Sequence, residues 1–188
     1  MSVFTNRGSA SKEHADAYIA AILEVLGETD PLDVLQATPA SFARAVDGLS
    51  PAELRAPEKP GKWSVQQVLA HMADSEVVWS WRLRMVLAHD RPPLTGYDQD
   101  LWAEHLGYED ADSRLSLRVF TTLRERNLEL LRRAGPEDLR RVGVHEERGD
   151  ESVQHMMRLY AGHDVVHTRQ LERIRSAVTV GRPVGSSS

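Results

Sequence analysis

The feature that most limits the fold of this chain is the helical spacing of its apolar residues. They recur every three or four positions in one segment after another, which is typical of amphipathic helices. No segment shows the sustained alternation of apolar and polar residues that a half-buried strand requires. The pattern therefore predicts an all-α fold: an antiparallel four-helix bundle with a long crossover connection and an extra N-terminal helix.

Local signals mark where the first helices begin and end. A helix over about 12–27 ends at a glycine. Asp30 is a typical N-cap residue and Pro31 is typical of the first helical position, so the next helix is expected to begin there. It runs to about residue 48, with a kink or break expected at Pro39. Ser64 and Gln67 form a capping box before a helix that reaches about residue 88.

The second half of the chain has the same kinds of helix start and stop signals. The segment 92–110 is a long connection with one short helix, and Asp110 or Asp112 begins a helix that ends before Gly135. Residues 141–149 are expected to be irregular or a brief hairpin. Asp150 or Ser152 then begins the last helix, which runs to about residue 176.

The domain boundaries follow from these segments. With 188 residues, the chain has the length of one domain and can bury a core without a disulfide or a metal. We expect an N-terminal helical extension over 1–29, a bundle over 30–178 and a flexible tail over 179–188.

Composition excludes several classes of function. The chain has no cysteine, which excludes disulfide scaffolds, thiolate nucleophiles and zinc sites that use Cys, so a metal site would need His and carboxylates. The net charge is −5 and the basic residues are scattered, so no nucleic-acid or membrane-surface partner is expected. No apolar run is long enough to span a membrane, and the first eight residues lack the apolar core of a signal peptide, so the default location is cytoplasmic.

Two histidines on the last predicted helix have the spacing of metal ligands. His163 and His167 lie four residues apart, one above the other, on the face that also carries Met156, Leu171 and Ile174. One buried His is more often a hydrogen-bonded core residue, but two at this spacing can reach one metal ion. His71, on the helix after the capping box, is a third candidate from a second helix. Three His would leave a coordination position open, as in catalytic zinc sites, although nickel, iron or copper accept the same donors.

The other histidines are weaker candidates. Surface or helix-capping roles are expected for them: His14, His89, His105, His145 and His155. His163 to His167 also has the spacing of the zincin motif, but Asp164 replaces the glutamate base of that motif and points away from the ligands.

Several short motifs, in order, resemble those of one family. They are Pro60-Gly-Lys-Trp63-Ser64, His71-x-x-Asp74-Ser75, Arg82, Tyr97-Asp98-x-x-x-Trp102 and His163-x-x-x-His167. Together they resemble the DinB-like metal-binding four-helix-bundle superfamily over about residues 30–178, in the branch described as metal-dependent hydrolases and related to bacillithiol S-transferases. The resemblance implies that His71, His163 and His167 bind one divalent metal, zinc or nickel, with water completing the shell.

Four further residues are candidates for roles around that metal. Asp74, one turn after His71, either fixes a ligating His ring or is a surface carboxylate. Arg82, eleven residues after His71 on the same face, either holds an anionic substrate or cofactor group or forms an ion pair within the bundle. On the long connection, Asp98 either orients a metal-bound water or caps the short helix, and Tyr97 is a candidate for cofactor binding.

The leading functional hypothesis is an enzyme with a small-molecule substrate. Three His with one metal would activate water, as in a hydrolase, or a low-molecular-weight thiol from solution, as in an S-transferase. The alternative is a non-catalytic, metal-binding stress-response bundle or a dimerising binding module. The helix with Trp79 and Trp81 is apolar on more than one face, which favours a homodimer.

Overall fold

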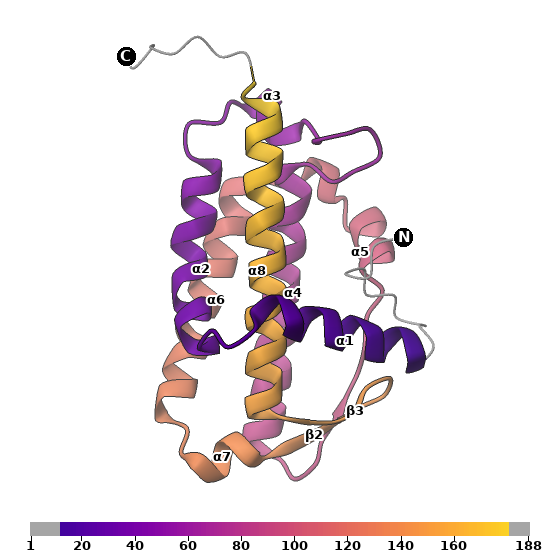
Figure 1. Cartoon of the computed structure of the whole chain (residues 1–188), viewed down its shortest axis with the longest axis vertical. Coiled ribbons are helices and arrows are strands. Elements are labelled where there is room, and N and C mark those ends of the chain that lie inside the picture. The colour runs from indigo at the N-terminus through magenta and orange to yellow at the C-terminus, as the bar shows by residue number, and fades with distance from the viewer. Residues whose placement is uncertain (1–11, 181–188) are drawn as a thin grey trace.

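The fold comes from a computed structural model that describes residues 12–180. Four long helices lie side by side: α2 (Pro31–Val46), α4 (Val65–Ala88), α6 (Ser113–Arg133) and α8 (Val153–Val178). A fifth, α1 (Lys12–Leu26), crosses the outside of α8 (Figure 1). The predicted all-α bundle with an extra N-terminal helix is confirmed. No helix in the described part of the chain is long and apolar enough to cross a membrane.

The long crossover determines the directions of the helices. Glu76 and Ser80 of α4 contact Arg124 and Asn127 of α6, so residue numbers rise together and these neighbours run parallel. Between α4 and α8 the numbers run in opposite senses, since His71 meets His163 whereas Arg82 meets Tyr160. The crossover is what makes the parallel pair possible, because it returns the chain to the end of the bundle where α4 began (Figure 1).

Short elements fill the connections. Helix α3 (Pro51–Arg55) precedes α4, α5 (Gln99–His105) and the 3₁₀ turn η1 (Tyr108–Asp110) lie in the crossover, and α7 (Pro136–Arg140) follows α6. The predicted hairpin is confirmed as β2 (Val142–His145) and β3 (Gly149–Ser152), which pair antiparallel. The sequence pattern did not predict β1 (Pro93–Leu94), which adds to β2 in parallel.

The caps explain where the bundle helices begin. The side chain of Ser64 accepts the backbone N–H of Gln67 and the Gln67 side chain reaches back to the backbone of Ser64, which confirms the capping box. Asp30, Asp112 and Ser152 accept backbone N–H groups at the starts of α2, α6 and α8. These interactions satisfy donors that have no partner inside the helix.

Helix α2 is not interrupted at Pro39, and its unpaired carbonyl has a partner on another helix. Because proline has no N–H, the carbonyl of Leu35 lacks its usual partner four residues later. The Nη1 of Arg124 donates to that carbonyl at 3.1 Å. The same guanidinium binds the buried carboxylates of Glu76 and Asp164 at 2.5–3.1 Å, so all five of its N–H donors are used.

A glycine allows α1 to lie close to α8, the helix that carries His163 and His167. A Cβ at Gly162 would overlap the backbone carbonyl oxygen of Ile22 and would lie 2.7 Å from the Cγ2 of the same residue. Gly162 directly precedes His163, so α1 crosses α8 at the level of the candidate site. The predicted extension is therefore packed against the bundle in the structure.

Candidate metal centre

Three histidine side chains meet between α4 and α8. His71 of α4 and His163 and His167 of α8 each offer one ring nitrogen, and these nitrogens lie within 4.8 Å of one another. The Nε2 atoms of His71 and His163 are 3.2 Å apart. Two nitrogens on one tetrahedral zinc, at bonds of about 2.0–2.1 Å, are separated by about 3.3 Å. The spacing therefore fits a shared divalent ion.

The protonation state of the cluster also fits a metal. Burial lowers the pKa of His71 well below its ordinary value, and the neighbouring His167 and His163 lower it further. Burial likewise lowers the pKa of His163 to about 4 and that of His167 to about 3. Near neutral pH all three rings are uncharged, which is the form that binds metals.

The second nitrogen of one ring has a defined partner. The Nδ1 of His167 lies 2.8 Å from the Oε1 of Gln170, one turn later on α8. This contact places the proton on Nδ1 and leaves Nε2 available to a metal. The Nδ1 atoms of His71 and His163 are buried and have no hydrogen-bond partner within residues 12–180. Gln170 lay outside the sequence prediction, although its spacing of three from His167 puts it on the same face.

Asp74 and Asp98 are placed away from the three rings. Asp74 accepts a 2.7 Å hydrogen bond from the hydroxyl of Tyr108, in the η1 turn. Asp98 accepts the backbone N–H groups of Asp100 and Leu101 and so caps α5, which was one of its two predicted roles. The structure therefore does not bring either carboxylate to a ring nitrogen.

Tyr97 is linked to the three histidines through the hydroxyl of Ser75. Its hydroxyl lies 2.7 Å from the Oγ of Ser75, and that Oγ lies 3.5 Å from the Nε2 of His71. Ser75 belongs to the motif that begins at His71 but was not predicted as a site residue. Its position four residues after His71 is the sequence signal that places both on one face.

Arg82 is buried, and its environment does not match one of its two predicted roles, the ion pair within the bundle. Within the described residues no carboxylate lies at ion-pair distance from it, so it is not part of an ion pair in the bundle. Its Nη2 donates to the carbonyl of Thr95 and lies 3.2 Å from the Nε2 of His145. The expected surface or capping role of His145 is wrong, since this ring is 1% exposed. The reason is that the sheet pairs β2 with β1 and folds the ring inward.

The remaining histidines and the tryptophans lie elsewhere. His89 and His105 are exposed, His155 is half-buried at the start of α8, and the side chain of His14 lies outside the described residues. Trp79 is in the core, whereas Trp81 is 63% exposed. The homodimer stays a prediction.

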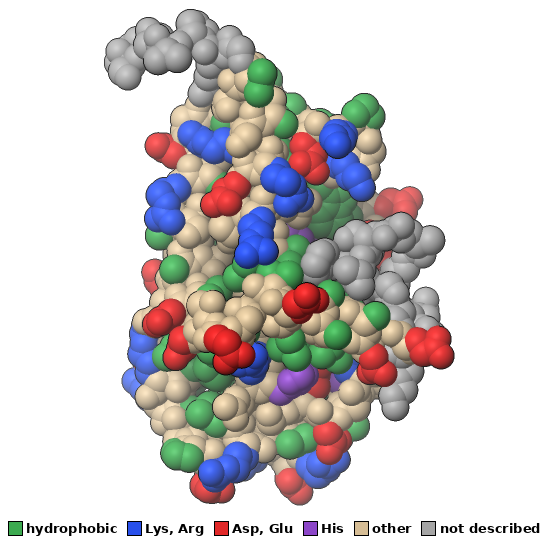
Figure 2. Space-filling view, in the orientation of Figure 1, with side chains coloured by type: hydrophobic (Ala, Val, Ile, Leu, Met, Phe, Trp, Pro, Cys, Tyr) green, Lys and Arg blue, Asp and Glu red, His purple; other side chains and the backbone are tan. Residues whose placement is uncertain are grey.

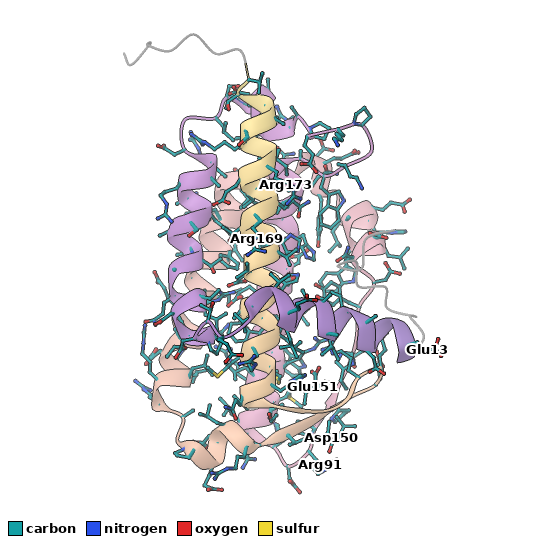
Figure 3. The ribbon with its side chains drawn as sticks, viewed as in Figure 1. Glu13, Arg91, Asp150, Glu151, Arg169 and Arg173 are labelled. Atoms are coloured by element: carbon teal, nitrogen blue, oxygen red, sulfur yellow. The ribbon has the colours of Figure 1, made fainter. Side chains whose placement is uncertain are left out.

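Two cavities adjoin the metal centre. An outer groove of about 470 Å³ has His167 and Gln170 in its wall together with Trp63, Arg169 and Arg173. Figure 2 shows Lys and Arg side chains beside a hollow on this face, and Figure 3 shows Arg169 and Arg173 following one another along α8. A separate inner cavity of about 40 Å³ has His163 and Ser75 in its wall. The centre is thus accessible from the surface.

Comparison with known proteins assigns the family. The sequence model of the DinB superfamily matches residues 34–171, a stretch that contains all three histidines. The chain belongs to the DinB superfamily. A relative from Bacillus mycoides named "Putative metal-dependent hydrolase" is 28% identical over 176 residues, covering 92% of this chain and 91% of its own length. A relative from Oceanobacillus iheyensis with the same description is 29% identical over 136 residues, covering 72% and 78%.

A solved structure supports the same placement of this DinB-superfamily chain. YfiT of Bacillus subtilis has a TM-score of 0.69 and 27% identity, and the match covers 89% of this chain and 91% of YfiT. YfiT is described as a probable metal-dependent hydrolase with an unusual four-helix bundle topology. The predicted family is therefore confirmed.

Proposed function

We propose that this DinB-superfamily protein is a metal-dependent hydrolase of small molecules. The observation that carries the proposal is the convergence of three neutral histidine rings at the wall of an open groove. Within residues 12–180 no Asp or Glu joins the three rings, so the protein side chains leave part of a metal's coordination shell open. That arrangement is typical of catalytic rather than structural sites.

The residues of the centre have separable tasks. A zinc or nickel ion held by His71, His163 and His167 would act as a Lewis acid and lower the pKa of a water molecule. Gln170 holds the His167 ring in one tautomer and one orientation. Trp63 packs against the ring of His71, with the ring centres 5.2 Å apart, and also lines the outer groove through which a substrate can enter.

Metal analysis and activity together test this function. The purified protein should hold about one zinc or nickel ion per chain, and His163→Ala should lose it and remain folded, because the core does not depend on one polar ligand. His105→Ala is the matched control, since His105 is an exposed histidine on α5. Metal that is fully retained in His163→Ala would overturn the site.

The reaction is tested with 4-nitrophenyl esters and small amides. We expect hydrolysis that disappears with a chelator and returns with zinc or nickel. Turnover of electrophiles only when a small thiol is added would instead assign the S-transferase alternative, in which the thiol comes from solution because the chain has no cysteine. Bound metal without turnover in either assay would identify a non-catalytic metal-binding bundle.

A further inference from the structure

The inner cavity beside His163 is built by side chains from distant parts of the chain. Tyr18 comes from α1, Arg82 from α4, Tyr97 from the crossover and Tyr160 from α8. Arg148 comes from the turn between β2 and β3. Such a wall of guanidinium and hydroxyl groups provides hydrogen-bond donors directed at one small volume.

Arg82 is the buried cation in this wall that lacks a counter-ion among the described residues. It is 4% exposed, and its polar partners are the Thr95 carbonyl, the His145 ring and the Tyr160 hydroxyl, the last at 3.5 Å. Its buried Nε has no hydrogen-bond partner in the described part of the chain. A buried charge is costly unless it is paired. The guanidinium of Arg82 is therefore in a position to bind an anion.

A second buried arginine shows how the same bundle neutralises such a charge. Arg124, on α6, is surrounded by Glu76 and Asp164, which use all of its donors together with one backbone carbonyl. Between residues 12 and 180, no pair of carboxylates surrounds Arg82 in this way. The difference indicates that a carboxylate at Arg82 would come from outside this part of the chain.

The other charges around the cavity leave one positive charge unbalanced. Arg148 is paired with Glu151 at 2.5 Å, and both are buried. His145 is uncharged near neutral pH, because burial lowers its pKa to about 3. Tyr18 is also uncharged, since burial raises its pKa to about 12. Among residues 12–180, the cavity lining and its ion-pair partner supply two guanidinium groups and one carboxylate, a balance that a single negative charge would neutralise.

The cavity is connected to the metal centre. The Tyr97 hydroxyl in its wall bonds to Ser75, whose Oγ is 3.5 Å from the Nε2 of His71, and His163 itself lines the cavity. A volume of about 40 Å³ holds a few water-sized groups, at about 10–15 Å³ or more for each water. This is the size of a carboxylate rather than of a whole substrate.

We propose that the inner cavity is a carboxylate subsite, and that the substrates are small molecules with a carboxylate close to the bond that reacts at the metal. The planar fork of Arg82 would bind the two carboxylate oxygens, and the tyrosine hydroxyls would donate to them. The substrate class rests on the proposed hydrolase function, whereas the binding of a carboxylate does not.

Binding of acetate to the full-length, zinc-loaded protein tests the subsite directly by calorimetry. We expect acetate to bind at least about tenfold more tightly than the neutral acetamide, because a hydrogen bond to a charged acceptor is stronger than one to a neutral acceptor. Arg82→Met should weaken acetate binding by a similar factor and leave the zinc content unchanged. Arg169→Met, an exposed position in the outer groove, is the control and should bind acetate as the unmodified protein does.

Two further measurements show where the acetate binds. Acetate should still bind after zinc is removed, and nuclear Overhauser effects should connect its methyl group to the rings of Tyr18 and Tyr160, not to Trp63. This measurement needs no variant, so it holds even if Arg82→Met fails to fold. Equal acetate affinity in a folded Arg82→Met, loss of binding with the zinc, contacts to Trp63, or tighter binding of inorganic phosphate would each overturn the carboxylate subsite.

Kinetics distinguish this inference from the proposed function. The 4-nitrophenyl monoester of succinic acid has a free carboxylate, and 4-nitrophenyl butyrate is its neutral analogue. We expect kcat/KM to favour the carboxylate ester by about tenfold or more, and Arg82→Met to abolish the preference. Equal rates for the two esters would refute the substrate class alone. Acetate binding without hydrolysis of either ester would refute the hydrolase alone.

Discussion

Replacing Arg124 should destabilise the protein far more than a typical arginine substitution. The side chains of Arg124 and Asp164 are 0% exposed and that of Glu76 is 1% exposed. Arg124→Met keeps most of the volume of the side chain but leaves two carboxylates without their cation. Removing one partner of a buried ion pair costs about 3–5 kcal/mol. For a chain of this length that corresponds to a fall in Tm of roughly 6–20 °C.

Chemical and thermal denaturation measure this loss, and Arg126→Met is the matched control. Arg126 is on the same helix and pairs with Glu129, but the two side chains are 51% and 42% exposed. An exposed pair of this kind contributes about 0–1 kcal/mol. We therefore expect the control to remain close to the unmodified protein.

The pH dependence and a rescue variant test the electrostatic reason. Burial already raises the pKa of Glu76 although Arg124 lowers it. Without Arg124 that pKa should rise further, so the folded variant takes up a proton and its deficit in stability shrinks as the pH falls. Combining Arg124→Met with Glu76→Gln and Asp164→Asn should recover much of the loss. A cost below about 1 kcal/mol for Arg124→Met, or no recovery in the triple variant, would refute the reasoning.

Three other changes have definite expected outcomes. Gln170→Leu should weaken metal binding by about 10–100-fold in a chelator competition, whereas the exposed Gln154→Leu on the same helix should not, and equal affinities would contradict the orienting role. Burial lowers the pKa of His145 from 6.5 to about 3, so below pH 6.5 the unfolded chain takes up a proton that the folded chain does not, and the free energy of unfolding falls as the pH falls. Between pH 7 and pH 5, His145→Gln should therefore lose about 2 kcal/mol less stability than the unmodified protein in urea titrations. The same pH dependence of stability in both proteins would refute this. Gly162→Ala should cost about 1–3 kcal/mol by forcing Ile22, and α1 with it, away from α8, and an unchanged urea midpoint would show that α1 does not need this close approach.

The sequence alone was sufficient for the local structure and for the three histidines that come together. The capping box at Ser64 and the caps at Asp30 and Ser152 are short-range interactions, so they are visible in a few consecutive residues. The spacing of His163 and His167 determines that they share a helix face whatever surrounds them. The addition of His71 needed a prediction that two helices would pack together, and the structure confirms that the three rings meet.

The surroundings of the metal centre were decided by the tertiary structure. Asp74 turns to Tyr108 in the crossover, and the parallel arrangement of α4 and α6 depends on that same long connection. Arg82 could not be assigned from its position on a helix, because its neighbours come from the crossover, the β-hairpin and α8. Helix periodicity shows which face of a helix is buried, since it is a property of one segment. It does not show which distant side chains that face will meet. Those contacts surround Arg124 with two carboxylates and, within residues 12–180, leave Arg82 without one.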